Sequence, residues 1–309
     1  MSKYLVTGGC GFIGSHLADA LVAAGHGVRI LDDFSTGKRE NAPSAAEIIT
    51  GDVADTETVR LAMAGMDGCF HLAAIASVVR SNEEWVRTHQ VNLTGTVNVF
   101  DSARETRMPV VYVSSAAIYG DNDDVPLAET ARPRPLTAYG ADKLGCEQHA
   151  RVGHEVHNIP STGFRFFNIY GPRQDPASPY SGVISIFADR TSNGQSIQIH
   201  GDGEQTRDFV YVGDAVRFLL KGMENLPAAP DVYNVCTGKG TSINRLAEII
   251  AELAGNPVDI SHGEPRVGDV RASIGDPSHA SKTLGIKVKT AIEDGLRLTL
   301  NPTKLSRAV

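Results

Sequence analysis

Residues 7–16 read TGGCGFIGSH and carry much of the information about the fold. They place Gly8, Gly11 and Gly14 at intervals of three, between the apolar run KYLVT (3–7) and an amphipathic segment. Such glycines allow a tight turn, close approach of the backbone to a pyrophosphate, and close packing of a helix on a strand. Free N–H groups at the start of that helix also attract an anion. The pattern predicts a dinucleotide-binding loop.

An acidic residue follows at the distance that such a loop requires. Asp32 ends the apolar run VRILD (28–32), where a carboxylate can accept hydrogen bonds from the adenosine ribose hydroxyls. A carboxylate would repel a 2′-phosphate, so NAD is favoured over NADP, although Asp33 and the cations at 38–39 follow closely. Asp52, after a third expected strand, has two equal interpretations: a partner of the adenine amine, or a carboxylate near a helix start.

Strand-like and helix-like segments alternate through the first half of the chain. The expected strands are 3–7, 28–32, 68–73 and 110–115, which are short and almost continuously apolar. Helices are expected over 83–106 and 137–158, and Leu93, Val97 and Phe100 form one stripe on the first. The alternation predicts the α/β class, with a Rossmann-type doubly wound parallel sheet.

The second half differs in composition. The segment YGPRQDPASPYSG (170–182) is rich in Pro, Gly and Ser and is expected to be a loop, with helices over 242–254 and about 290–299. We expect residues 1–167 to form an NAD-binding Rossmann domain that includes the catalytic residues. Residues 168–309 should form a smaller α/β lobe for the substrate, partly interleaved with the first domain.

Composition limits the classes of function. The chain has 309 residues and a formal net charge of −7, which argues against nucleic acid as the main partner. The sequence has no apolar run long enough for a membrane helix and no apolar signal core at its start, so a cytoplasmic protein is expected. The cysteines are scattered and predict neither a disulfide framework nor a zinc site, and no metal is expected: Cys10, Cys69, Cys146 and Cys236.

The segment YGADK (139–143) places Tyr139 and Lys143 four residues apart, on one face of a helix. An ammonium beside a phenol stabilises the phenolate, so such a tyrosine can act as a general base. Ser115 ends the expected strand 110–115, and ligands bind at the carboxyl ends of parallel strands. Ser115 can therefore bond the substrate oxygen that Tyr139 deprotonates.

Five motifs in order, TGGCGFIG, HLAA (71–74), VSSAAIYG, YGADK and FRFFNIYGP, resemble the extended short-chain dehydrogenases/reductases, in their nucleotide-sugar epimerase/dehydratase branch. The resemblance spans residues 3 to about 300. It implies that NAD is bound by Gly8, Gly11, Phe12, Ile13, Gly14, Asp32, Asp33, Asp52, Val53, Leu72, Ala73, Ala74, Asn92, Tyr139 and Lys143. It implies that Ser115, Tyr139 and Lys143 form the catalytic trio, and that the protein pairs as a homodimer through 83–106 and 137–158.

The residues that follow Ser115 help to distinguish between the reactions of this branch. Dehydratases and decarboxylases of this branch carry an acid there, whereas Ala116 and Ala117 follow Ser115 here. What remains suits a 4-epimerase that moves one hydride and one proton through a transient 4-keto sugar. A net reductase and a non-catalytic NAD-binding regulator are the alternatives outside this reaction.

The resemblance also implies a substrate site. It assigns the nucleotide sugar to Asn168, Arg207, Arg266 and Asp269, with His200 where relatives often place an aromatic residue under uracil. Ser273 falls on the position that gates substrate size, and a serine there leaves room for a 2-acetamido group. The expected reaction interconverts UDP-N-acetylglucosamine and UDP-N-acetylgalactosamine, and to some extent UDP-glucose and UDP-galactose. A UDP-glucose or UDP-glucuronate 4-epimerase stays open. Ser77 and Ser81 are further expected contacts of the sugar, alongside Ser115.

Overall fold

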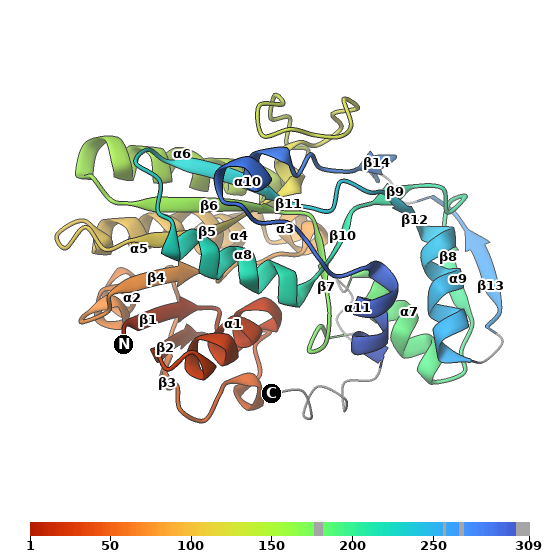
Figure 1. Cartoon of the computed structure of the whole chain (residues 1–309), viewed down its shortest axis with the longest axis horizontal. Helices are drawn as coiled ribbons and strands as arrows, with labels where there is room; N and C mark the ends of the chain where they lie inside the picture. The colour runs from red at the N-terminus through yellow and green to blue at the C-terminus, as the bar shows by residue number, and fades with distance from the viewer. Residues whose placement is uncertain (176–181, 256–257, 266–268, 301–309) are drawn as a thin grey trace.

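The computed structural model describes residues 1–175, 182–255, 258–265 and 269–300. Its main layer is a seven-stranded sheet in the order β11-β6-β5-β4-β1-β2-β3, and every neighbouring pair is parallel (Figure 1). The strands are β1 (Lys3–Thr7), β2 (Gly27–Asp32), β3 (Glu47–Thr50), β4 (Gly68–His71), β5 (Val110–Ser115), β6 (Ser161–Phe166) and β11 (Asp231–Val235). The expected doubly wound α/β fold is confirmed.

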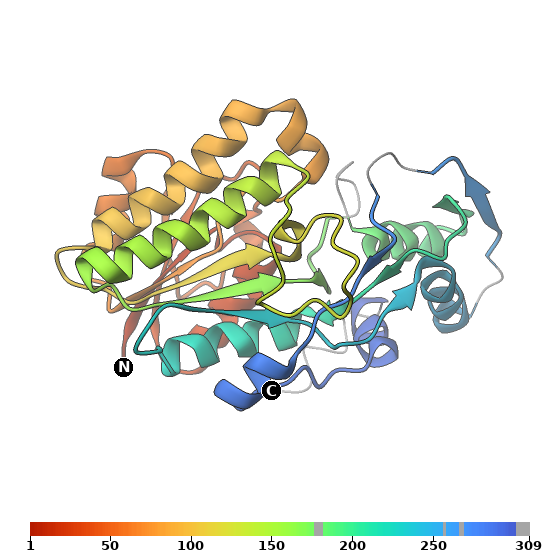
Figure 2. The ribbon, with the colours of Figure 1, turned by 90° about the horizontal axis from the view of Figure 1, so that it is seen from above.

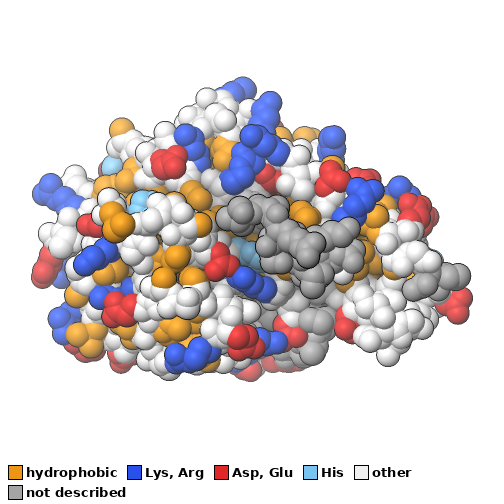
Figure 3. Space-filling model, turned by 60° about the horizontal axis from the view of Figure 1, so that its bottom comes forward, with side chains coloured by type: hydrophobic (Ala, Val, Ile, Leu, Met, Phe, Trp, Pro, Cys, Tyr) orange, Lys and Arg blue, Asp and Glu red, His pale blue; other side chains and the backbone are white. Residues whose placement is uncertain are grey.

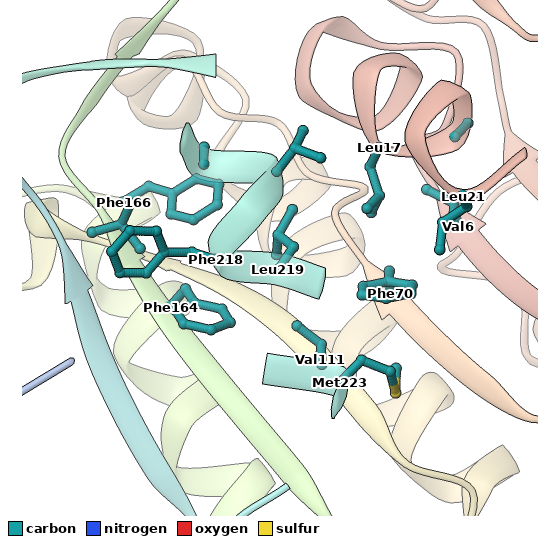
Figure 4. Packing of buried hydrophobic residues seen from close by; sticks show 14 of the residues in the cluster. Val6, Leu17, Leu21, Phe70, Val111, Phe164, Phe166, Phe218, Leu219 and Met223 are labelled. Carbon is teal, nitrogen blue, oxygen red and sulfur yellow. The ribbon is translucent and has the colours of Figure 1, made fainter. Parts of the chain in front are cut away.

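Helices cover both faces of this sheet. One face carries α1 (Phe12–Ala23), α8 (Val212–Glu224) and α10 (Ser278–Thr283); the other carries α2 (Thr56–Met63), α5 (Gly95–Ala103) and α6 (Ala138–His157) (Figure 2). Burial on both faces explains why the strands are almost continuously apolar. On the first face, Val6 lies beside Leu21 of α1, and Val111 lies on the side of α8 (Figure 4).

The direction of winding reverses between β1 and β4. From β1 the chain continues to β2 and β3 on one side, and then crosses to β4, β5 and β6 on the other. Ligands of doubly wound sheets bind outside the carboxyl ends of the strands at such a reversal. The glycine loop follows β1 and residues 72–75 follow β4, so both lie at this point.

The expected helix over 83–106 is confirmed over residues 85–103, with one wider turn inside it. The structure has α3 (Val78–Glu83), α4 (Trp85–His89), a wide turn η2 (Gln90–Thr94) of the π-helical type, and then α5. Asn92 explains the wide turn, because its carboxamide accepts a hydrogen bond from the Ile75 N–H (2.8 Å) and donates to the Ile75 carbonyl (3.1 Å). A tertiary contact thus reshapes the middle of a helical segment, as π-bulges often do near functional sites.

The second half of the chain builds smaller sheets and also returns to the first. The small sheets pair β7 (Asn168–Tyr170) with β10 (Phe209–Tyr211), β8 (Ile197–His200) with β13 (Ile260–Gly263), and β9 (Thr206–Arg207) with β12 (Thr241–Ser242) and β14 (Ala272–Ser273). Around them lie α7 (Val183–Ser192), α9 (Ile243–Ala254) and α11 (Ile292–Leu300). The last two match the expected helices, and β11 and α8 complete the large sheet and its cover.

The surface mixes both signs of charge. On the face in Figure 3, Lys and Arg side chains are interspersed with Asp and Glu. Within the described ranges, no helix combines the length and the apolar character that crossing a membrane requires.

Candidate active site

The predicted cofactor and catalytic residues gather at one edge of the large sheet. Each lies at or after the carboxyl end of a strand, or on the helix that follows it: residues 8–14 after β1, Asp32 and Asp33 at β2, Asp52 and Val53 after β3, residues 72–74 after β4, Ser115 at β5, and Asn168 after β6. Parallel strands bring these ends together although the residues are up to 160 positions apart.

The glycine loop is closely packed. Gly8 has φ +68°, and a Cβ there would lie 2.9 Å from the backbone of Ala73. A Cβ on Gly14 would lie 2.1 Å from the carbonyl oxygen of Gly8. Both positions therefore require glycine, and the loop after β1 touches the segment after β4.

Asp32 closes the loop from the side of β2. Its carboxylate accepts hydrogen bonds from the N–H groups of Cys10 and Phe34, both at 2.9 Å. Burial raises the pKa of Asp32, and these two hydrogen bonds oppose the rise. Asp33 bonds Ser35 instead, and Asp52 forms an ion pair with Arg87 at 2.6 Å.

The predicted trio lies where β5 ends and α6 begins. The Ser115 hydroxyl accepts the N–H of Ala117 at 3.1 Å. The Lys143 ammonium donates to the carbonyl of Val113 at 2.8 Å, which anchors α6 beside β5. The same ammonium lies 5.9 Å from the ring centroid of Tyr139. Among the described residues, the Tyr139 hydroxyl has no hydrogen-bond partner, so it is available to a substrate oxygen.

A second group of predicted residues lies in the small sheets. Ser273 on β14 is the strand neighbour of Arg207 on β9, and the Arg207 guanidinium forms a short ion pair with Asp269. His200 ends β8, and its Nδ1 lies 3.3 Å from the carbonyl of Glu264. Arg266 falls outside the described residues. The structure therefore joins Arg207, Asp269 and Ser273 in one place and puts His200 at the end of a neighbouring small sheet.

Comparison with known proteins identifies the family. The model of the NAD dependent epimerase/dehydratase family matches residues 4–236. The chain belongs to this family. The UDP-glucose 4-epimerase of Mycolicibacterium smegmatis is 36% identical over 307 residues, which cover 96% of this chain and 97% of that protein.

Two solved structures are similar over almost their whole length. A Thermotoga maritima UDP-glucose 4-epimerase with UDP-glucose has a TM-score of 0.94 and 37% identity, and covers 98% of this chain and 99% of its own. A UDP-N-acetylglucosamine 4-epimerase from Methanobrevibacter ruminantium, in complex with UDP-N-acetylmuramic acid, has a TM-score of 0.93 and 36% identity, and covers 99% of both chains.

The residues at the sheet edge fit the NAD that this epimerase/dehydratase family uses. The start of α1 has no side-chain cap, so the N–H groups of its first turn are open where a pyrophosphate is favoured. Asp32 stands at the end of β2, where a carboxylate suits ribose hydroxyls. The fit supports a resident NAD held by the loop after β1 and by Asp32.

We expect Gly14→Ala to remove bound NAD and to lower stability. The new methyl group would overlap the Gly8 carbonyl, which is backbone and cannot rotate away, so the loop must shift. Cofactor content of the purified protein, measured by absorbance after denaturation, checks this. Gly25→Ala is the matched control, because a Cβ there meets nothing within 4 Å, although its φ of +81° adds some strain. Full NAD content in Gly14→Ala would contradict the prediction.

His71, a buried histidine that was not predicted to have a role, helps to hold the backbone of residues 72–73, which are predicted to contact NAD. The Thr7 hydroxyl accepts the N–H groups of Leu72 and Ala73, both at 3.1 Å, so its proton must go to His71 Nδ1 at 2.8 Å. His71 Nε2 then donates to Thr96 at 3.0 Å. Burial, with Lys143 nearby, lowers the pKa of His71 to about 3. The ring is therefore neutral, with one tautomer.

Two residues that are predicted to contact NAD are buried inside the protein. Asn92 is 1% exposed, and it holds Ile75 from behind. Val53 is also buried, and its carbonyl accepts a hydrogen bond from Asn98 at 2.9 Å. Direct contact of Asn92 and Val53 with the cofactor stays a prediction.

The prediction that Ser81 contacts the sugar is wrong. Ser81 is fully buried, where its hydroxyl donates to the Val78 carbonyl (2.7 Å) and accepts the Tyr139 N–H (3.3 Å). It supports the start of α6 instead. Ser77 is half-buried, and its hydroxyl accepts the Arg80 N–H at 3.0 Å and so caps α3.

A buried ion pair beneath the trio was missed. Arg165 on β6 and Glu147 on α6 form two hydrogen bonds of 2.9 and 2.7 Å, and their side chains are 8% and 6% exposed. Ser114, next to Ser115, donates to the same carboxylate at 2.5 Å. The sequence carried a signal for each partner: an arginine inside the apolar run of β6, and a glutamate one helical turn after Lys143.

No group of three or more metal-ligating side chains occurs in the described ranges.

Proposed function

We propose that this chain is an NAD-dependent UDP-sugar 4-epimerase that interconverts UDP-N-acetylglucosamine and UDP-N-acetylgalactosamine. The observation that carries the proposal is the position of Ser115, Tyr139 and Lys143 at the junction of β5 and α6, with two alanines directly after Ser115. Relatives that cover nearly the full length of the chain are named UDP-glucose 4-epimerase and UDP-N-acetylglucosamine 4-epimerase. These names support epimerisation at C4 and are compatible with either sugar as the substrate.

The residues at the junction suit one proton transfer. Tyr139 takes the proton of the sugar 4-hydroxyl, and Ser115 holds the same oxygen by a hydrogen bond. The ammonium of Lys143 lies beside the Tyr139 ring and stabilises the phenolate. NAD, when bound, supplies the hydride acceptor and donor for C4. After the 4-keto sugar turns over in the site, Tyr139 returns the proton.

The neighbours of Ser115 favour epimerisation over elimination. Ala116 and Ala117 form the short helix η3 (Ala116–Ile118) and offer no acid or base. Loss of water or of a carboxyl group from the sugar would need a further proton donor or acceptor near C5. The trio alone suffices for epimerisation at C4.

A UDP-sugar with a bulky group at C2 is the substrate that we propose for this site. Guanidinium groups bind diphosphate in bidentate fashion, so Arg207 suits the diphosphate and Arg266 is proposed as its companion. Asp269 is proposed for the uridine ribose, His200 for the uracil, and Asn168 and Ser77 for the rest of the nucleotide sugar. The register of β14 with β9 sets Ser273 beside Arg207, which supports Ser273 as part of the same wall.

We expect Ser273→Tyr to reduce turnover of the acetylated sugar selectively and to spare the plain one. A tyrosine ring would fill the volume that a 2-acetamido group needs, so kcat/KM for UDP-N-acetylglucosamine should fall at least about 10-fold relative to UDP-glucose. Ser273→Ala is the control and should keep both substrates. Each variant is assayed by chromatography of the C4 epimers. Undiminished epimerisation of the acetylated sugar by Ser273→Tyr would reject the gate.

A product assay tests the proposal as a whole. Purified protein is incubated separately with UDP-N-acetylglucosamine, UDP-glucose and UDP-glucuronate, and the C4 epimers are resolved. Conversion of the acetylated sugar at least as fast as UDP-glucose supports the proposal. Conversion of UDP-glucose or UDP-glucuronate alone assigns the alternative epimerase. Net NADH release, which requires net oxidation of the sugar, would indicate an oxidoreductase that does not return the hydride, and no turnover of any substrate would indicate a non-catalytic regulator.

We also propose two lobes and a homodimer. Residues 1–167, joined by β11, α8 and α10, form the NAD-binding lobe, and most of 168–309 forms the lobe for the nucleotide sugar. The dimer would use α4 and α6, where four apolar side chains are at least half exposed: Trp85, Val86, Val152 and Val156. Light scattering of the purified protein tests the dimer.

A further inference from the structure

One buried carboxylate outside the trio connects three segments of the substrate lobe. Asp208 follows Arg207 and is fully buried. Its Oδ1 accepts the N–H and the hydroxyl of Thr237, at 2.8 and 2.7 Å. Its Oδ2 accepts the N–H groups of Gly238 and Gly275, at 2.9 and 3.4 Å. The side chain thus ties the start of β10 to the loop after β11 and to the residues after β14.

The backbone of Asp208 adds two contacts to proposed substrate residues. Its N–H donates to the carbonyl of Ser273 at 3.0 Å. Its carbonyl accepts the N–H of Asn168, also at 3.0 Å. Arg207 is its immediate neighbour in the chain. Asp208 is therefore connected through its own backbone to three residues that are proposed to bind the nucleotide sugar.

The protein holds this charge without a cation. In the described part of the chain, Asp208 forms no ion pair, and its partners are three N–H groups and one hydroxyl. Burial raises the pKa of Asp208, and the hydrogen bonds from Thr237, Gly238 and Gly275 oppose the rise. A buried carboxylate is costly unless such donors satisfy it, so the position of each donor is tightly constrained.

We propose that Asp208 is a positioning residue for the nucleotide-sugar site: it sets the relative places of Arg207, Ser273 and Asn168, and through them the affinity for UDP and the preference between acetylated and plain sugars. This inference rests on the proposed UDP-sugar function. Asp208 does not touch the substrate; it acts through the residues that do.

Asp208→Asn tests the proposal because it keeps the shape and removes one acceptor. An amide NH2 in place of Oδ2 would face the N–H groups of Gly238 and Gly275, which cannot turn away. The NH2 group should therefore face Thr237, whose N–H then loses its acceptor. A shifted loop at Thr237 and Gly238 should displace β14, and we expect the dissociation constant of UDP to rise about 10-fold or more.

Asp214→Asn is the matched control. Asp214 is also buried, its carboxylate accepts the N–H groups of Lys289 and Thr290 at 3.2 and 2.9 Å, and it pairs with Arg217. These contacts join α8 to the segment before α11 and include none of the proposed substrate residues. Asp214→Asn should lower the thermal midpoint and leave the dissociation constant of UDP unchanged.

The measurement is a calorimetric titration of each full-length, NAD-containing protein with UDP, together with epimerisation of UDP-N-acetylglucosamine and UDP-glucose. Weaker UDP binding and a smaller ratio between the two sugars in Asp208→Asn, with unchanged NAD content and unchanged Asp214→Asn binding, support the proposal. Equal UDP binding by Asp208→Asn and wild type overturns it.

Two further results separate the remaining outcomes. If Asp208→Asn does not fold, Thr237→Val replaces it, because it removes the hydroxyl donor to Asp208, together with the contacts of that hydroxyl with Lys239. Weaker UDP binding that Thr237→Ser restores supports the proposal, and unchanged binding overturns it. If the wild-type protein itself does not bind UDP, the proposed substrate class fails, and the positioning role fails with it. That result is distinct from normal wild-type binding with an unaffected variant.

Discussion

Replacement of Tyr139 by phenylalanine should reduce epimerisation of UDP-sugars by about 10²–10⁴-fold, the usual contribution of a positioned acid–base group. Only the phenol oxygen is lost, and within the described ranges this oxygen has no hydrogen-bond partner. The side chain is 9% exposed, so the ring itself should keep its packing. The loss should therefore appear in kcat, with NAD content and the thermal midpoint close to wild type.

Tyr211→Phe provides the comparison. Tyr211 is similarly buried on β10, and its hydroxyl also has no partner among the described residues, but it has no place in the proposed proton transfer. Initial rates with both UDP-sugars, determined over a range of concentrations, separate kcat from KM. A Tyr139→Phe protein with more than about one tenth of the wild-type kcat would mean that another group moves the proton.

Breaking the buried pair of Arg165 and Glu147 should have the largest effect on stability. Arg165→Met leaves the Glu147 carboxylate 6% exposed and without its cation, and one-sided removal of a buried pair costs about 3–5 kcal/mol. For a chain of 309 residues, the thermal midpoint should fall by roughly 5–8 °C. Activity should fall too, since Glu147 holds Ser114 and lies on the helix that carries Tyr139.

Two variants show whether charge is the cause. The double variant Arg165→Met with Glu147→Gln carries no unpaired buried charge, so it should be more stable than Arg165→Met alone. Arg297→Met removes an exposed pair with Asp294, where solvent screens the interaction, and should change the thermal midpoint little. A midpoint equal to wild type in Arg165→Met would show that the pair does not hold α6 on the sheet.

The elements that could be predicted are those with local causes. The strand, glycine loop and helix at residues 3–23 were predicted because each glycine role is set by its immediate neighbours. The four-residue spacing of Tyr139 and Lys143 likewise follows from helix geometry alone. The parallel, doubly wound character of the large sheet followed from strand–helix alternation, whereas its strand order came from the structure.

The elements that could not be predicted depend on distant contacts. The helix expected over 83–106 contains a π-helical turn at Gln90–Thr94, where Asn92 binds Ile75, 17 residues earlier. Ser81 was expected to contact the sugar, but it is buried and accepts the N–H of Tyr139, 58 residues later. In both cases a side chain forms a hydrogen bond with a backbone group from a distant segment, and no local sequence pattern predicts that bond.

The amino-acid sequence by itself determined the fold class, the NAD loop and the residues proposed for chemistry, because periodicity and short motifs act within a few residues. Tertiary structure alone decided which polar groups support them. The carboxylates of Glu147 and Asp208 are stable inside the protein only where donors from β5, from β6 and from the segments after β11 and β14 converge. Such convergence exists only after the strands have assembled, so the sequence identifies the reacting groups and the folded chain places them.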